Sequence, residues 1–270
     1  MRPFIGELAI GKMAILVLAI FGSPIVAVRQ PVVVELFTSE GCSSCPPADR
    51  LLADVVTTMP EGVEVIALSE HVDYWDGLGW RDPFSNKLFT ERQDRYAAHF
   101  GPDKIYTPQM IVDGTSELVG SDRAQLMKAL AAAKTRAKAS VTLAWRGANA
   151  LDVKVSGAAK SSDVMLAITE DGLSVDVKRG ENAGHILPHV RVVRSLVKIG
   201  QTDDNGALTI SLPAEHVGAD LQVRAEWKRA ALRATVFVQT RGLGPITGAA
   251  SVPFIAAKPL AFPVADPLPR

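Results

Sequence analysis

The chain has 270 residues, of which 47% are hydrophobic and 21% are charged. It can therefore bury a sizeable core, and extensive disorder is not expected. Its 29 Lys and Arg residues balance its 29 Asp and Glu residues. This balance gives neither the basic surface of a nucleic-acid-binding protein nor a polybasic membrane anchor, so we expect no nucleic-acid partner.

The first 27 residues have the order of an export signal. Arg2 and Lys12 precede an apolar run over 13–21, and Gly22, Ser23 and Pro24 break it. The run is shorter than the roughly 20 residues that span a bilayer. We expect cleavage after Ala27, a periplasmic or secreted protein, and no stable membrane span once the signal is removed. An uncleaved N-terminal anchor is the alternative.

A strand, a helix and a second strand follow the signal. Residues 31–38 (PVVVELFT) form a nearly continuous apolar run, which is typical of a strand buried on both faces. Apolar residues then recur at helical spacing until Pro60, and residues 63–68 (VEVIAL) predict the second strand. This βαβ order indicates a parallel sheet.

A polar and aromatic segment over 69–80 leads to a second helix. Asp82 and Pro83 have the residue types of an N-cap followed by proline at the first helical position. They predict a helix that runs to about His99.

A hairpin and a third helix complete the first half of the chain. Residues 107–112 predict a strand that opens on proline, and Asp113-Gly114 is a hairpin turn signal. The chain returns over 117–120, and a final helix is predicted over 121–139.

The pattern changes near Ser140. Short strands with alternating apolar residues follow one another, separated by turn residues, and this arrangement predicts an antiparallel sandwich. They are expected at 141–145, 151–155, 164–169, 173–178, 191–199, 207–212, 221–227 and 232–239. We place a domain boundary near 140 and a second domain over 140–240. Residues 241–270 are rich in proline and predict an extended tail.

The chain's two cysteines, Cys42 and Cys45, lie three positions apart where the first strand gives way to the first helix. A disulfide between such close neighbours gains little stability from loop closure, so redox chemistry or metal binding explains the pair better than a structural disulfide does. A helix N-terminus stabilises a thiolate, which favours Cys42 as the attacking thiol. Cys45 would then resolve the mixed disulfide. A structural disulfide and a metal site remain the alternatives.

Four segments carry a resemblance to a known family: ELFTSEGCSSCPPADRLL, HVDYWDGLGWRDPFS, YTPQMIVDG and GENAGHILPHVRVVRSL. They resemble a bacterial exported family known as domain of unknown function 1223, which belongs to the thioredoxin-like superfamily. The resemblance covers residues 31 to about 240. It implies an α/β thioredoxin-like domain over 31–139, followed by the all-β antiparallel sandwich-like domain. It also implies that Pro108 is a cis-proline beside Cys42, and that Thr107 offers backbone groups to a bound peptide.

Two further groups of residues are candidates for the site. His71 and Trp75 follow the carboxyl end of the 63–68 strand, where sites gather in open α/β sheets, so they could form a substrate wall beside the dithiol. They could equally belong to a loop that plugs the core. His185 and His189 have the spacing of ligands on a helix, but Pro188 argues against a helix there, and a loop that leans on the first domain is the alternative.

The sequence therefore predicts an exported thiol-disulfide oxidoreductase that acts on protein or peptide cysteines. Cys42 and Cys45 would be catalytic, the substrate would dock over Thr107 and Pro108, and no bound cofactor is needed. One alternative is a copper metallochaperone that uses both cysteines and His71, because thiolates favour Cu(I). Another is a non-catalytic thioredoxin-like binding module.

Overall fold

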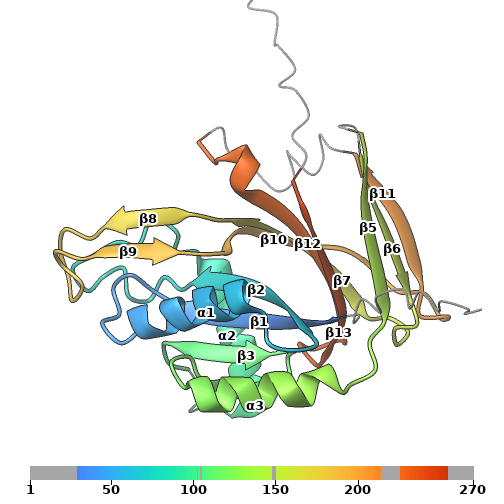
Figure 1. Cartoon of the computed structure of the whole chain (residues 1–270), viewed down its shortest axis with the longest axis horizontal. Coiled ribbons are helices and arrows are strands. Elements are labelled where there is room, and N and C mark those ends of the chain that lie inside the picture. The colour runs from blue at the N-terminus through green and yellow to red at the C-terminus, as the bar shows by residue number, and fades with distance from the viewer. Residues whose placement is uncertain (1–28, 102, 104, 148–149, 214–225, 255–270) are drawn as a thin grey trace, which may run out of the picture.

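An eight-stranded mixed sheet forms the centre of the molecule (Figure 1). The computed structural model describes residues 29–101, 103, 105–147, 150–213 and 226–254. The strand order is β13-β12-β7-β10-β2-β1-β3-β4. β2 is parallel to both β1 and β10, and the other pairs are antiparallel. The strands are β1 (Gln30–Thr38), β2 (Val63–His71), β3 (Gln109–Val112), β4 (Ser116–Val119), β7 (Asp163–Glu170), β10 (Val192–Gln201), β12 (Leu232–Gln239) and β13 (Ile246–Pro253).

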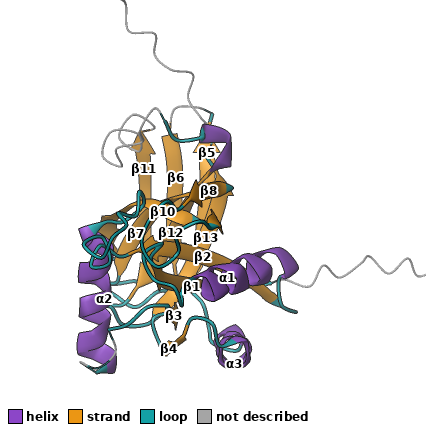
Figure 2. Cartoon of the chain, turned by 90° about the vertical axis from the view of Figure 1, so that its left-hand side faces the viewer, coloured by secondary structure: helices purple, strands orange, loops and turns teal. Residues whose placement is uncertain are grey.

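Helices cover both faces of the part of the sheet built on β1 and β2, as Figure 2 shows. α1 (Pro46–Thr58) and α3 (Arg123–Lys134) share a core with Val32 and Val34 of β1. The alternate residue Val33 packs in another core with Phe89 of α2 (Lys87–Phe100). Successive strand residues point to opposite faces, so burial on both faces explains the continuous apolar run of β1.

Two smaller sheets come from the second half of the chain. The sheet β11-β6-β5 packs on β7 and β12 through a shared apolar core. β8 and β9 pair only with each other and form a hairpin that lies beside α1 (Figure 1). The bounds are β5 (Ser140–Arg146), β6 (Ala150–Ser156), β8 (Leu173–Asp176), β9 (Ile186–His189) and β11 (Leu208–Pro213).

The predicted fold class, a thioredoxin-like α/β domain followed by a separate antiparallel sandwich, is wrong. The molecule is mostly β, and one mixed sheet runs through both halves of the chain. The junction is the pairing of β10 with β2, where Val192 lies opposite Ser69. Strands from the second half therefore extend the sheet that β1 and β2 begin. Local alternation predicts that a strand exists but not which strand it joins.

Two smaller expectations also changed, and others lie outside the described residues. α2 begins at Lys87, with Asn86 as its N-cap, rather than at Pro83. The Asp82 carboxylate does accept from the amide of Phe84, but this bond belongs to a separate turn that precedes the helix. β13 occupies part of the expected tail. The signal over 1–27, the tail from 255 and most of the strand expected at 221–227 lie outside the described residues.

Candidate functional site

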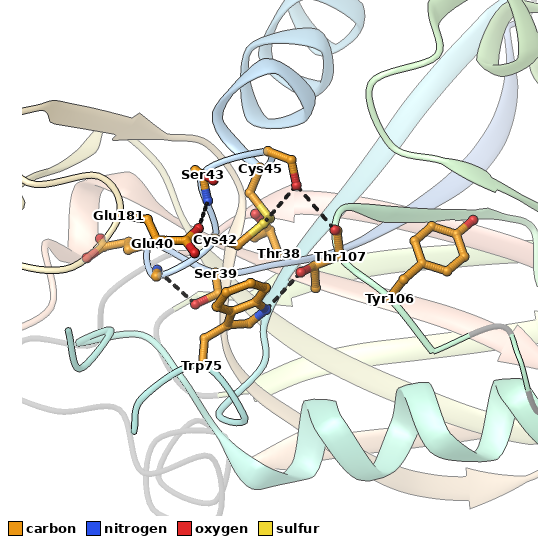
Figure 3. Close-up of a disulfide and its surroundings, with 12 residues drawn as sticks. Thr38, Ser39, Glu40, Cys42, Ser43, Cys45, Trp75, Tyr106, Thr107 and Glu181 are labelled. Atoms are coloured by element: carbon orange, nitrogen blue, oxygen red, sulfur yellow. Dashed lines mark hydrogen bonds between the residues drawn. A yellow bond between two sulfur atoms is a disulfide. The ribbon is translucent and has the colours of Figure 1, made fainter. Parts of the chain in front are cut away.

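A disulfide joins Cys42 and Cys45 where β1 leads into α1 (Figure 3). Their Cα atoms are 5.4 Å apart. The segment turns before the helix starts, because the amide of Cys45 donates to the carbonyl oxygen of Cys42. Cys45 is the N-cap of α1, so Cys42 lies one turn before the helix rather than at its first residue. Both cysteines are completely buried, at 0% exposure, in this disulfide-bonded form.

Trp75 and Thr107 close one side of the disulfide. The Trp75 indole N–H donates to the Thr107 hydroxyl at 2.9 Å, and the Ser44 hydroxyl donates to the Thr107 carbonyl oxygen at 3.4 Å (Figure 3). The Thr107–Pro108 peptide bond is cis, which confirms what the resemblance implies. Three of the expected site features, the cysteine pair, Trp75 and the Thr107–Pro108 segment, thus lie together.

The tip of the β8–β9 hairpin closes the other side. The Asn182 side-chain amide donates to the carbonyl oxygens of Glu40 and Cys42, at 2.8 and 3.0 Å. The Glu181 carboxylate accepts from the amide of Ser43 at 3.0 Å (Figure 3), and these hydrogen bonds lower the pKa of Glu181. Sequence reasoning missed both residues. The GENAGH segment stood out only through the resemblance, because no spacing relates it to cysteines about 140 positions earlier.

A buried group of acids and imidazoles surrounds Glu40, two residues before Cys42. His71 Nδ1 is 2.7 Å from Asp82 Oδ2, and His189 Nε2 is 3.2 Å from Glu40 Oε1. The two imidazole rings are 4.9 Å apart, and the Trp80 indole donates to the second oxygen of Glu40 at 2.7 Å. Burial would lower the pKa of His71, but the contact with Asp82 outweighs it and the net shift is upward. Burial likewise opposes charge on Asp82, yet His71 holds the pKa of this carboxyl below its usual value.

These partners change the roles expected for the histidines. His71 is fully buried and pairs with Asp82. His189 is a buried residue of β9, whereas His185 is exposed, and the two do not form a pair of ligands. Within the described ranges, no group of three or more His, Cys, Asp or Glu side chains is placed to hold a metal ion.

Asp49 is the buried acid that follows Cys45 by one helical turn. Its amide donates to the carbonyl oxygen of Cys45, and residues at i and i+4 lie on the same helix face. One carboxylate oxygen accepts from the Thr38 hydroxyl at 3.1 Å. Burial raises the pKa of Asp49, and His189 and His71 offset the rise only in part. Sequence reasoning missed Asp49. The signal that could have found it is its position four residues after Cys45 on a predicted helix, which places both residues on the same helix face.

Asp49 also faces a cleft of about 430 Å³ between α1 and the hairpin. Ser43, Pro46 and Pro47 form its helix side, and Glu181 and Ile186 belong to its hairpin side. The cleft gives the buried acid a route to solvent.

A second buried charged cluster lies on the α2 face of the sheet. Arg92 Nε donates to Glu35 at 2.5 Å, and its Nη2 donates to Gln239 of β12 at 3.0 Å. Tyr96 donates to the other oxygen of Glu35 at 2.6 Å. Glu70 Oε1 is 3.7 Å from Arg92 Nε in this cluster. Burial and the nearby Glu35 raise the pKa of Glu70 well above its usual value, against the effect of Arg92.

The fold and the site define a mixed-sheet protein with a buried CxxC disulfide at the start of a helix. Residues 33–239 match a family described as a protein of unknown function (DUF1223). The match covers more than half of the chain, and the protein belongs to this family.

The solved structures that are similar to this chain include the following two. One is an X-ray crystal structure of a protein from Agrobacterium tumefaciens, with 30% sequence identity and a TM-score of 0.69, covering 85% of this chain and 97% of that one. The other is HBP35 of Porphyromonas gingivalis, with 17% identity and a TM-score of 0.59, covering 90% of this chain and 81% of that one. The second likeness concerns the fold alone. No curated protein matches the chain, and no helix among the described residues is long and apolar enough to span a membrane.

Proposed function

We propose that the protein is an exported thiol-disulfide oxidoreductase that exchanges its Cys42–Cys45 disulfide with cysteines of proteins or peptides. The observation that carries the proposal is the place of this disulfide. It uses every cysteine of the chain, sits at the N-terminus of α1 and lies beside the Thr107–Pro108 segment. Such a short disulfide loop contributes little to stability, so reversible chemistry accounts for it better.

The exchange starts from the oxidised form. A thiolate of the partner attacks Sγ of Cys42, the bond between the two sulfurs breaks, and its electron pair goes to Sγ of Cys45. A second thiolate of the partner then attacks the partner sulfur in the mixed disulfide and expels Cys42. The partner is oxidised to a disulfide and the protein is reduced to a dithiol, and the reverse reaction passes through the same intermediate.

Asp49 supplies the proton that the first step needs. Cys45 is fully buried, and burial raises the pKa of a thiol, so an uncompensated Cys45 thiolate is unfavourable. Asp49 lies on the same helix face, its pKa is raised by burial, and it lines the cleft through which protons can exchange with solvent. It protonates Cys45 during reduction and accepts the proton back during oxidation.

The remaining residues around the disulfide position the partner. Thr107 and Pro108 hold the partner's chain beside Cys42, with Trp75 fixing the Thr107 hydroxyl. His71 supports the segment before Cys42 indirectly, because it pairs with Asp82, whose carboxylate accepts from the amide of Glu40.

Trapping of the mixed disulfide tests the proposal. Reduced Cys45→Ser protein is mixed with a denatured, disulfide-bonded polypeptide, and the products are separated without reductant. Cys42 should form a mixed disulfide that accumulates, because the resolving thiol is absent. Cys42→Ser protein should trap nothing. The proposal fails if neither variant traps the polypeptide, or if both trap it equally.

A further inference from the structure

We propose that the tip of the β8–β9 hairpin, residues 180–185, is a lid over the disulfide, and that a polypeptide partner opens it by replacing its hydrogen bonds. The inference rests on the proposed function for its partner. It begins from a conflict within the site, because both cysteines have 0% exposure. A thiolate needs access to a sulfur atom, so at least one covering element must move.

The hairpin tip contacts the cysteine loop in space, although it lies about 140 positions later in the sequence. Asn182 is itself buried, and its amide bridges the carbonyl oxygens of Glu40 and Cys42, on both sides of Gly41. Glu181 accepts from the amide of Ser43, the next residue along. Three main-chain groups of the cysteine loop are therefore satisfied by side chains of one hairpin tip (Figure 3 shows Glu181 against Ser43).

The tip is built as a separate unit. β8 and β9 pair only with each other, and the turn is closed by its own bonds, from the amide of Val177 to the carbonyl oxygen of His185 and from the amide of Gly184 to that of Val177. Gly180 and Gly184 have positive φ angles, of 79° and 81°, which glycine adopts readily. The base stays anchored, because His189 is buried against Glu40. Movement can thus be confined to the tip.

The pattern of bonds identifies the kind of partner. Opening leaves the carbonyl oxygen of Glu40 and the amide of Ser43 without these partners, and the carbonyl oxygen of Cys42 keeps only the amide of Cys45. Unpaired main-chain groups are costly. An extended polypeptide offers both N–H and C=O groups to replace them, whereas a small thiol offers none. The neighbouring cleft adds apolar walls at Pro46, Pro47 and Ile186 for the residues that flank the partner's cysteine.

The rate of disulfide reduction tests the lid. Oxidised protein is treated with excess dithiothreitol, and free thiols are counted by alkylation and mass spectrometry. Asn182→Ala removes two buried hydrogen bonds and should speed reduction about tenfold, which corresponds to about 1.4 kcal/mol. Glu181→Gln should speed it about threefold. Asp176→Asn is the matched control, because Asp176 lies on the same hairpin but bonds Lys178, and it should leave the rate unchanged.

Asn182→Asp keeps the size of the side chain but turns its donors into an acceptor that faces two carbonyl oxygens, so it should be at least as fast as Asn182→Ala. Thermal melting identifies the variants that remain folded. If both folded Asn182 variants are reduced at the wild-type rate, there is no lid.

The second arm uses an unstructured peptide with two cysteines in place of dithiothreitol. A peptide that replaces the tip's bonds opens the lid itself, so Asn182→Ala should accelerate its reaction less than threefold. Equal acceleration with both reductants would overturn the polypeptide part of the inference. Failure of the Cys45→Ser trap together with faster reduction of Asn182→Ala by dithiothreitol would refute the proposed function and leave the lid standing.

Discussion

Replacement of Asp49 by Asn should slow disulfide exchange without unfolding the protein. Asn keeps the shape of the side chain and an oxygen that can accept from the Thr38 hydroxyl, but it cannot supply a proton at neutral pH. General acid catalysis contributes about 10²- to 10⁴-fold. Asp49 lines a cleft of about 430 Å³, where water can replace part of its function, so we expect the low end, a loss of about 100-fold.

The pH dependence gives the sharper readout. Asp49 donates only while it is protonated, and burial raises its pKa. The acid-catalysed part of the wild-type rate should therefore be present below this raised pKa and be lost as the pH rises through it. Asp49→Asn should lack that step.

The assay is single-turnover reduction of the oxidised protein between about pH 5 and pH 9, a range that begins above the ordinary carboxyl pKa and includes the unperturbed thiol pKa of about 8.5. It is repeated in the Asn182→Ala background, so that opening of the lid does not mask the proton transfer. Asp54→Asn is the control, because Asp54 lies on the same helix and pairs with Arg123 at the surface. A wild-type rate and profile in Asp49→Asn, or an equal loss in Asp54→Asn, would refute the assignment.

The other predictions concern stability. Arg92→Met should lower the free energy of unfolding by about 3–5 kcal/mol in urea titrations, because it leaves the buried Glu35 without its cation; a loss below 1 kcal/mol would contradict this. Glu70→Gln should stabilise the protein increasingly as the pH rises. Between the usual and the raised pKa of Glu70, the folded state binds one more proton than the unfolded state, so the wild type loses stability as the pH rises through that window. The measurement is the melting temperature of both proteins against pH, and a constant difference between them would contradict the shift. Gly114→Ala should lower the melting temperature, because Gly114 has φ 64° and its Cβ would lie 2.6 Å from the carbonyl oxygen of Gly244; an unchanged melting temperature would show that the turn adapts.

The sequence predicted the individual elements better than their assembly. The runs that became β1 and β2, the helical spacing of α1 and the Asp113-Gly114 turn are local signals, and the elements formed there. The fold class was wrong because the partner of a strand is decided by packing across the whole chain. Nothing in the alternation of residues after 140 says that β10 completes β2.

The site residues likewise fall into those that local sequence signals predict and those that only the folded chain brings together. Cys42, Cys45 and Pro108 could be found from a short motif and a resemblance, whereas Asn182 and Glu181 reach the cysteine loop from about 140 positions away. Asp82 had the sequence of a helix cap, and one of its oxygens does accept from the amide of Phe84, while the other binds His71 and the amide of Glu40. A capping motif cannot reveal that the second oxygen of the same carboxylate pairs with a buried imidazole.

The position of β2 inside the sheet has a consequence for biosynthesis. A ribosome that has made β1, β2 and the β3–β4 hairpin has made a sheet whose β2 edge is still open, because the strand that covers it, β10, is encoded much later. An uncovered strand edge invites pairing with other chains. The native contacts of β2 are far apart in sequence, which slows folding of the complete chain. Nascent chains of this protein should therefore depend on a holding chaperone until the second half has been synthesised.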